Sequence, residues 1–295
     1  MQYCTKCVYP GITGIPLHFD KEGVCTGCRV EEQKRKINWD ERARMLKELF
    51  DKYKSNTNYD CIIPVSGGKD SYFQTHYVTK ILGLKPLLVT YHGNNYLPEG
   101  ERNLQRMRKV FDVDHIIFRP SKKLLIKMNR LCFVKMGDMN WHAHCGIYTY
   151  PIQVAVKFKI PLIMWGEHGP TDLSGMYSMN DFVEMTAKER LEYSLRGFDW
   201  YDMVNEEEGI REKDILWAKY PSDKELEENR IRGIYIGNYV NWDSNKQFEI
   251  IKKDYNWKGS RKPFERTYRT MSNLDDIHEN GMHDYLKYIK FGYGR

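Results

Sequence analysis

The chain has 295 residues, of which 41% are hydrophobic and 29% charged, a composition typical of a globular protein with one large core or two modest ones. It contains no run of about eighteen apolar residues, and its first ten residues lack the apolar core of a secretory signal, so we expect a cytoplasmic protein without a membrane span. The formal net charge of +6 comes from basic residues interleaved with acidic ones. Because a nucleic-acid-binding protein is expected to cluster its basic residues, nucleic acid is not a predicted partner.

Two CxxC pairs open the chain, formed by Cys4, Cys7, Cys25 and Cys28 and separated by 17 residues. Each pair can bend as a turn that points both sulfurs at one ion, and this spacing is typical of a zinc ribbon. Disulfides and an iron-sulfur cluster are the alternatives, although disulfides are rare in cytosolic proteins. We therefore predict a zinc ribbon over residues 1–37, in which a structural Zn²⁺ compensates for the small apolar core.

An amphipathic helix is predicted from Asn38 to Tyr53, and a short apolar strand over residues 59–65 follows it. The strand runs into SGGKDS, and apolar residues then recur at helical spacing. Glycines allow the loop to turn its amides inward, while the helix start and a lysine add positive charge, so the loop predicts a polyphosphate site. The spacing does not fit the Walker pattern, which disfavours a P-loop kinase or GTPase. The residues concerned are Val65, Ser66, Gly67, Gly68, Lys69, Asp70 and Ser71.

Strands and helices alternate beyond this loop. Strands are predicted at 86–91, 115–118 and 162–165, and helices at 97–110, 124–134 and 147–159. This alternation predicts an α/β fold with a parallel sheet, whose ligands bind at the carboxyl ends of the strands. Side chains that follow strands two and four should therefore lie near Ser66: Thr90, Tyr91, His92 and Asn94, and Gly166, Glu167 and His168. Glu167 could bind Mg²⁺ or contact a substrate, and a solvated loop carboxylate is the alternative.

A cluster of possible ligands precedes the helix predicted to start near Ile147. It contains His142, His144, Cys145 and Gly146. At a helix N-terminus the thiolate of Cys145 would be favoured, and it could contact a substrate, form a persulfide or bind a metal. The other two cysteines of the main domain, Cys61 and Cys132, are predicted to be core residues.

The alternation is lost over residues 171–230, which we predict to be an insertion that covers the nucleotide site. A fifth strand and an aromatic loop are predicted over 233–242, and a helix over 246–255. Tyr239 and Trp242 could stack on a sugar, although core packing explains such aromatics equally well. These patterns divide the chain into a ribbon (1–37), a main domain (38–258, with its insertion) and a C-terminal helical segment (259–295).

A family resemblance rests on SGGKDS together with several other segments. The loop resembles the PP-loop of the ATP pyrophosphatase superfamily, whose members split ATP between the α and β phosphates and adenylate a carbonyl oxygen. Nearly the whole chain is similar to the N-acetyl sugar amidotransferases of bacterial surface polysaccharide (lipopolysaccharide O-antigen) and pseudaminic acid biosynthesis. Family members often continue past the last segment, so we expect a short or truncated form. The segments are CTKCVYP, GVCTGC, PVSGGKDS, IPLIMWGEHG, YIGNYVNWD and HDYLKYIKFGYGR.

This resemblance implies a Rossmann-like PP-loop fold, ATP and Mg²⁺ as cofactors, and a nucleotide-linked N-acetyl sugar as substrate. The sugar's acetamido oxygen would be adenylated, and ammonia would then displace AMP to leave an acetamidine. The ammonia would come from a partner glutaminase of the histidine-biosynthesis type, with a cyclase-like subunit. The implied catalytic residues are Lys69, Asp70 and Glu167. ATP would contact residues 65–71, Thr90, Tyr91 and Gly166, and the sugar would contact His92, Asn94, Cys145, Gly146, His168, Tyr239 and Trp242.

Two rival functions remain open. A PP-loop tRNA sulfur transferase would use Cys145 or Cys132, but such enzymes typically need a further CxxC or paired catalytic cysteines. Here the two cysteines are thirteen residues apart and none follows Cys145. A zinc-ribbon adaptor with a degenerate nucleotide fold is the non-enzymatic alternative, and the intact SGGKDS argues against it.

Overall fold

A six-stranded sheet organises the computed structural model, which describes residues 1–15, 17–263 and 270–292. The strand order is β3-β2-β1-β4-β6-β5, and every neighbouring pair is parallel except β5 and β6. The predicted α/β class with a largely parallel sheet is therefore confirmed. The strands are β1 (Cys61–Pro64), β2 (Pro86–Tyr91), β3 (Asp114–Phe118), β4 (Leu162–Trp165), β5 (Glu184–Met185) and β6 (Arg232–Tyr235).

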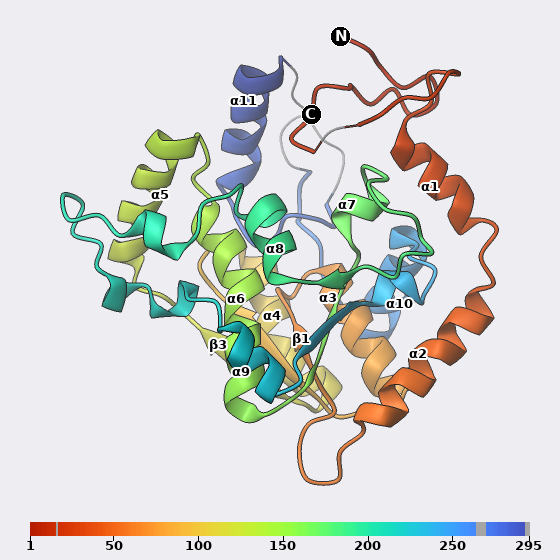
Figure 1. Cartoon of the computed structure of the whole chain (residues 1–295). Coiled ribbons are helices and arrows are strands. Elements are labelled where there is room, and N and C mark those ends of the chain that lie inside the picture. The colour runs from red at the N-terminus through yellow and green to blue at the C-terminus, as the bar shows by residue number, and fades with distance from the viewer. Residues whose placement is uncertain (16, 264–269, 293–295) are drawn as a thin grey trace.

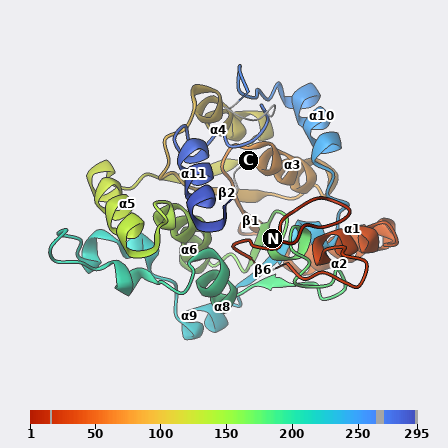
Figure 2. The same ribbon diagram turned by 90° about the horizontal axis from the view of Figure 1, so that it is seen from above.

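Helices cover both faces of the sheet, which explains why β1, β2 and β4 are almost continuously apolar. Figures 1 and 2 show helices on either side of the sheet. Ile63 and Leu88 pack with residues of α2, α3, α4 and α10 on one face, whereas Ile62 and Leu87 pack with α6 on the other. The helices are α1 (Thr26–Lys34), α2 (Trp39–Tyr53), α3 (Lys69–His76), α4 (Pro98–Phe111), α5 (Lys122–Met136), α6 (Trp141–Phe158), α7 (Gly169–Asp172), α8 (Ala187–Glu189), α9 (Asp223–Glu228), α10 (Ser244–Tyr255) and α11 (Glu279–Phe291).

The sheet topology fixes where a ligand can bind. From β1 the chain proceeds outward through β2 to β3, then returns through α5 and α6 to place β4 on the other side of β1. The loops that leave β1 and β4 therefore diverge at the carboxyl edge of the sheet. A crevice at such a switch point is the usual ligand site of an open α/β sheet.

Helix α6 begins at Trp141, six residues before the predicted start. Trp141 is almost fully buried, and its indole N–H donates to the carbonyl oxygen of Phe198 at 2.9 Å. This packing extends the helix through the His- and Cys-rich segment, whose residue types gave no clear helical pattern. Cys145 consequently lies in the second turn of α6 and not at its N-terminus.

The segment predicted as an insertion adds the antiparallel edge strand β5 and several short helices. Its apolar residues, including Met203, Ile210 and Trp217, pack with Cys132 of α5 and Cys145 of α6 in a separate buried cluster. Within the described ranges, no helix is both long enough and apolar enough to span a bilayer. The last residues of the FGYGR segment, 293–295, lie outside the described residues.

Candidate active site and metal centre

The SGGKDS loop connects β1 to α3 at the switch point. Gly67 has a positive φ of +80°, and a Cβ there would approach the backbone of Leu104 to 2.7 Å, so this position requires glycine on both grounds. The Gly67 carbonyl accepts a hydrogen bond from the Trp257 indole at 3.0 Å. Gly68 precedes α3 as its N-cap and has no side chain to satisfy the first amides of the helix. These helix-terminal amides are suited to an anion.

Side chains of the loop add charge and hold its shape. The Ser71 hydroxyl accepts from the Ser66 backbone N–H at 3.0 Å, and the Ser66 hydroxyl accepts from the Gly68 N–H at 3.3 Å. The Lys69 ammonium lies 2.5 Å from an oxygen of Asp70 and 3.3 Å from the Ser244 hydroxyl of α10. A buried lysine held by a carboxylate and a hydroxyl, at the start of a helix without a side-chain cap, can bind phosphate oxygens.

Two cavities adjoin this loop, and they share Ser66 and Asp275. The first, of about 200 Å³, is largely apolar and extends between the strand ends and α6. The second, of about 210 Å³, is polar and lies between the loop and residues 271–275. The first is lined by Pro64, Val65, Ser66, Ser71, Val89, Tyr91, Asn94, Tyr96, Ala143, Ile147, Tyr148, Pro151, Trp165 and Asp275; the second adds Gly68, Lys69, Asp70 and Gly100.

The buried Oδ1 of Asn94 has no hydrogen-bond partner within the described part of the chain. It belongs to a residue that lines the apolar cavity. An unsatisfied buried acceptor is costly, and a ligand N–H group would remove this cost. Asn94 thus lies where an amine-bearing base or substrate would meet it.

Glu167 follows β4 and lies at the exposed carboxyl edge of the sheet, across the switch point from the loop. Partial burial of its carboxyl group raises the pKa to about 7, and repulsion by Asp70 and Asp172 adds to this shift. The same edge is contacted by the ribbon, since Lys34 of α1 forms an ion pair with Asp172 of α7. Glu167 can therefore titrate near neutral pH close to Asp70 and Asp172, and it does not line either cavity.

Two predicted nucleotide contacts, Thr90 and Gly166, and one predicted substrate contact, Gly146, have structural positions next to cavity-lining residues. The buried Thr90 hydroxyl donates to the Val65 carbonyl oxygen at 2.6 Å, so it holds the end of β1 in place. Gly146 of α6 packs against the Tyr91 ring, where a Cβ would approach ring atoms to 2.3 Å. Gly166 lies beside the side-chain amide of Gln74. These residues shape the wall without lining either cavity.

Of the seven predicted substrate contacts, Asn94 lines a cavity and the other six do not; four of these six have evident contacts elsewhere. His92 pairs with Glu101 at 2.7 Å and stacks on Tyr96, and the buried His168 pairs with Glu189 at 2.6 Å. The aromatic side chains of Tyr239 and Trp242 pack against the core next to Phe182 and Phe73, respectively. Each of these groups has a packing or hydrogen-bonding role that explains its position.

Cys145 does not have the activated thiolate expected of a helix N-terminus. Its side chain is fully buried, and burial raises its pKa to about 11 despite the Arg190 guanidinium, whose Nη2 lies 3.5 Å from the sulfur. Cys132 is equally buried, and its pKa is raised to about 12. Neither cysteine lines the cavities.

Asp275 was not found by sequence reasoning, because it lies in the segment interpreted only as C-terminal and helical. The insertion predicted to cover the nucleotide site does not line either cavity; Trp217 of the insertion instead supports Tyr91 from behind, with ring centroids 4.8 Å apart. Residues 271–275 cover the polar cavity in its place.

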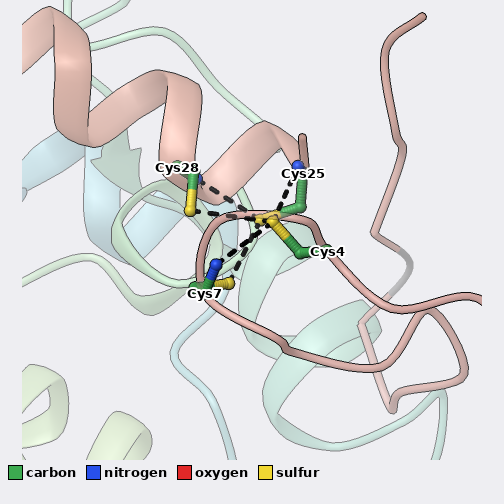
Figure 3. Close-up of side chains that lie close together, drawn as sticks. All are labelled: Cys4, Cys7, Cys25 and Cys28. Carbon is green, nitrogen blue, oxygen red and sulfur yellow. Dashed lines mark hydrogen bonds between the residues drawn. The ribbon is translucent and has the colours of Figure 1, made fainter. Parts of the chain in front are cut away.

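The four cysteines of the ribbon come together, as Figure 3 shows, and their sulfur atoms all lie within 4.8 Å of one another. The Cys4–Cys28 and Cys7–Cys25 sulfur distances are 3.9 and 3.7 Å. A tetrahedral ion with metal–sulfur bonds of about 2.3 Å gives sulfur separations of about 3.8 Å, so this donor set fits a four-coordinate metal ion. No other group of three or more His, Cys, Asp or Glu ligand atoms gathers in the described part of the chain.

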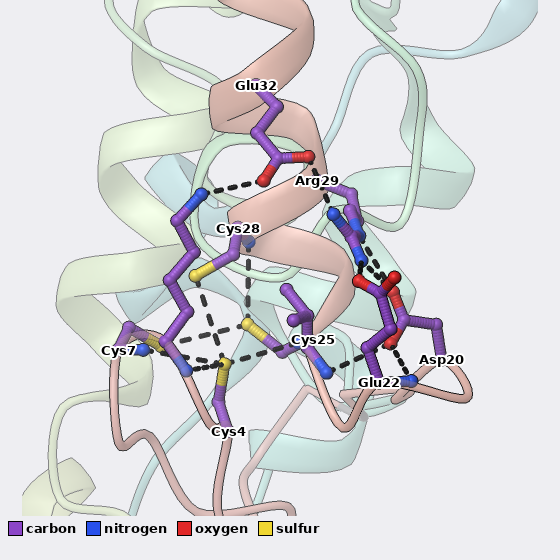
Figure 4. Close-up of polar contacts among 10 residues, drawn as sticks. Cys4, Cys7, Asp20, Glu22, Cys25, Cys28, Arg29 and Glu32 are labelled. Carbon is purple, nitrogen blue, oxygen red and sulfur yellow. Dashed lines mark hydrogen bonds and ion pairs between the residues drawn. The ribbon is translucent and has the colours of Figure 1, made fainter.

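Hydrogen bonds to the cysteine sulfur atoms also favour metal binding. The Cys4 sulfur accepts from the backbone N–H groups of Lys6, Cys7 and Cys25 at 3.3–3.5 Å, and Cys25 caps α1 by accepting from the Cys28 N–H. Amide donors to sulfur favour the thiolate form that binds metals. Arg29 of α1 joins Asp20, Glu22 and Glu32 around this centre (Figure 4).

Comparisons with known proteins give only distant similarities. No family model matches the chain. An uncharacterized protein of Methanocaldococcus jannaschii is 26% identical over 115 residues, which cover 39% of this chain and 41% of that protein. The match therefore spans less than half the length of that curated relative.

The solved structures with similar folds match this chain at low TM-scores and low sequence identity. The U34-tRNA thiolase NcsA of Methanococcus maripaludis, with its 4Fe-4S cluster, has 15% identity over 99% of this chain and 87% of its own, at a TM-score of 0.38. The NMN synthetase of Francisella tularensis has 10% identity over 74% of this chain and 96% of its own, at a TM-score of 0.37. The NH3-dependent NAD synthetase of Campylobacter jejuni has 9% identity over 63% of this chain and 99% of its own, at a TM-score of 0.35. Function is therefore inferred from the site itself.

Proposed function

We propose that the chain is an ATP-dependent amidotransferase, which adenylates the acetamido oxygen of a nucleotide-linked N-acetyl sugar and replaces that oxygen with ammonia. The observation that carries the proposal is the pair of cavities whose linings share Ser66 and Asp275. The polar cavity contains Lys69 and lies at the start of α3, and the apolar cavity has the aromatic lining that suits a base. The choice of an N-acetyl sugar rests on the resemblance of the sequence segments.

The proposed reaction has two steps. The acetamido oxygen attacks the α-phosphorus of ATP and pyrophosphate leaves, which gives an adenylated imidate. Ammonia then adds to the imidate carbon and AMP leaves with the former carbonyl oxygen, so that loss of a proton yields the acetamidine. Lys69 and the α3 amides would stabilise charge on the departing pyrophosphate. Asp70 or Glu167 would hold a Mg²⁺, which would neutralise further negative charge there.

Ammonia fits this site better than a cysteine-borne sulfur as the second nucleophile. Cys132 and Cys145 are buried, their thiols have raised pKa values, and neither reaches a cavity. Only thiolates are good sulfur nucleophiles. Because most ammonia is protonated near neutral pH, we propose that a glutaminase subunit supplies it, with a cyclase-like subunit as a second partner. The ribbon would hold one structural Zn²⁺.

The direct test supplies ATP, Mg²⁺, an ammonium salt and UDP-linked diacetamido sugars. We expect AMP, pyrophosphate and a sugar product lighter by about one mass unit, because NH replaces oxygen. With ¹⁸O in the acetamido group, the label should appear in AMP. A parallel reaction contains tRNA and a sulfur donor. ATP-dependent tRNA thiolation without any amidine would overturn the proposal in favour of sulfur transfer.

A further inference from the structure

The C-terminal segment 270–278 is built into the wall of the nucleotide site. The Leu97 N–H donates to the Leu274 carbonyl oxygen at 3.0 Å, and the Ile277 N–H donates to the Asn95 carbonyl oxygen at 2.9 Å. Leu274 is buried in the main core, and its carbonyl would lie only 2.1 Å from a Cβ on Gly100. This segment is therefore held against the start of α4 on both sides of Asp275.

Anchoring on either side places Asp275 at the junction of the two cavities. It lines both of them, and the only other residue among the described ones that does so is Ser66. The apolar cavity extends from this junction toward Tyr91 and Trp165, and the polar cavity extends toward Lys69. Asp275 thus lies opposite the first residue of the SGGKDS loop.

The covalent order of a nucleotide determines which part of it would meet this junction. A base in the apolar cavity and phosphates in the polar one leave the ribose between them. Carboxylates are effective acceptors for ribose hydroxyl groups. We infer that Asp275 binds the ribose hydroxyls of ATP, and that segment 270–278 is therefore part of the nucleotide site; this inference rests on the proposed function.

The test compares binding of MgATP, 2′-deoxy-ATP and 3′-deoxy-ATP by calorimetry, without any acceptor sugar. We expect the native protein to bind ATP about 10-fold more tightly than at least one deoxy analogue, as for loss of a hydrogen bond to a charged group. Asp275→Ala should weaken ATP binding to the level of that analogue and abolish the preference. Asp275→Asn, which keeps one acceptor oxygen, should retain part of it.

Asp276→Asn is the matched control. The Asp276 carboxylate accepts from the backbone N–H groups of Asn95 and His278, so it supports the segment without lining a cavity. This variant should weaken binding of the three nucleotides equally. The inference would be overturned if Asp275→Ala still bound ATP more tightly than the deoxy analogues. It would also be overturned if the only effect of this variant were a higher Mg²⁺ concentration needed for ATP binding. Failure of the native protein to bind any nucleotide would refute the proposed function as well.

Discussion

Lys69 lines the polar cavity and is expected to supply its positive charge, and only 8% of the residue is exposed. Loss of a preorganised charge next to a leaving group typically costs 100- to 1000-fold in rate. We expect Lys69→Ala to lower AMP formation by at least about 100-fold, measured as sugar-dependent AMP and pyrophosphate release. Lys80→Ala, at an exposed position of the π-helical turn Tyr77–Ile81, should have no effect. Unchanged AMP formation in the Lys69 variant would disprove its role.

Cys145 provides the complementary prediction at the residue scale. Because its thiol is buried and its pKa is raised to about 11, it has little thiolate at neutral pH. Cys145→Ser should therefore keep AMP release within a few-fold of the native rate. A stably folded variant that releases no AMP would show that this sulfur takes part in the reaction.

Glu167 should make AMP formation depend on pH. Both roles considered for it, binding Mg²⁺ and contacting the substrate as a base or acceptor, need the ionised carboxylate. Because its pKa is raised to about 7, the ionised fraction grows as the pH rises through 7. We expect the rate of AMP formation to rise as the pH increases through 7 and to fall at lower pH. Glu167→Gln should lack this dependence on pH. The rate is to be measured from pH 5.5 to 8.5, and an identical profile for both proteins would contradict the assignment.

At the scale of elements, the contact between α1 and α7 attaches the ribbon to the active-site edge. Gly27 lies so close to α7 that a Cβ would approach the Leu173 carbonyl oxygen to 2.5 Å. Gly27→Ala should therefore destabilise the protein by about 1–3 kcal/mol, measured by denaturant unfolding. Gly281→Ala in α11 is the control, since no atom of the described residues lies within 4 Å of a Cβ built there. There the higher helix propensity of alanine should give a gain of about 0.5–1 kcal/mol.

The predictable elements were those with a strong local pattern. Strands β2 and β4 have the bounds predicted from the sequence, because buried parallel strands read as continuous apolar runs. Helix α6 starts six residues before its predicted start, because the packing of Trp141 that extends the helix is a tertiary effect. Asp275 could not be found either, since only the contacts of Leu274 and Ile277 with the β2–α4 connection bring it to the cavities.

At the scale of the whole molecule, the ribbon and the sheet have separate cores but share one edge. The apolar cluster of the ribbon is small, with Leu17 and Val24 as its buried aliphatic residues next to Cys4 and Cys25. The sheet has its own large clusters on both faces. A bound metal is therefore expected to stabilise the ribbon far more than the sheet. The Lys34–Asp172 ion pair nevertheless connects the ribbon to the surroundings of Glu167.

Metal removal should consequently unfold the ribbon and leave the sheet folded. Elemental analysis of the purified protein should find one zinc ion per chain. A strong chelator should remove this ion. We expect the backbone amides of α1 to lose their protection from hydrogen exchange, while the amides of β1, β2 and β4 stay protected. MgATP affinity should decrease without being abolished, because the Lys34–Asp172 pair is lost but Val65, which precedes the SGGKDS loop, stays hydrogen-bonded to β2. Cys4→Ser should reproduce this state, and the chelator should then have no further effect. Cooperative loss of protection across the whole sheet would contradict the separation of the two cores, and iron in place of zinc would identify the centre as an iron-sulfur site.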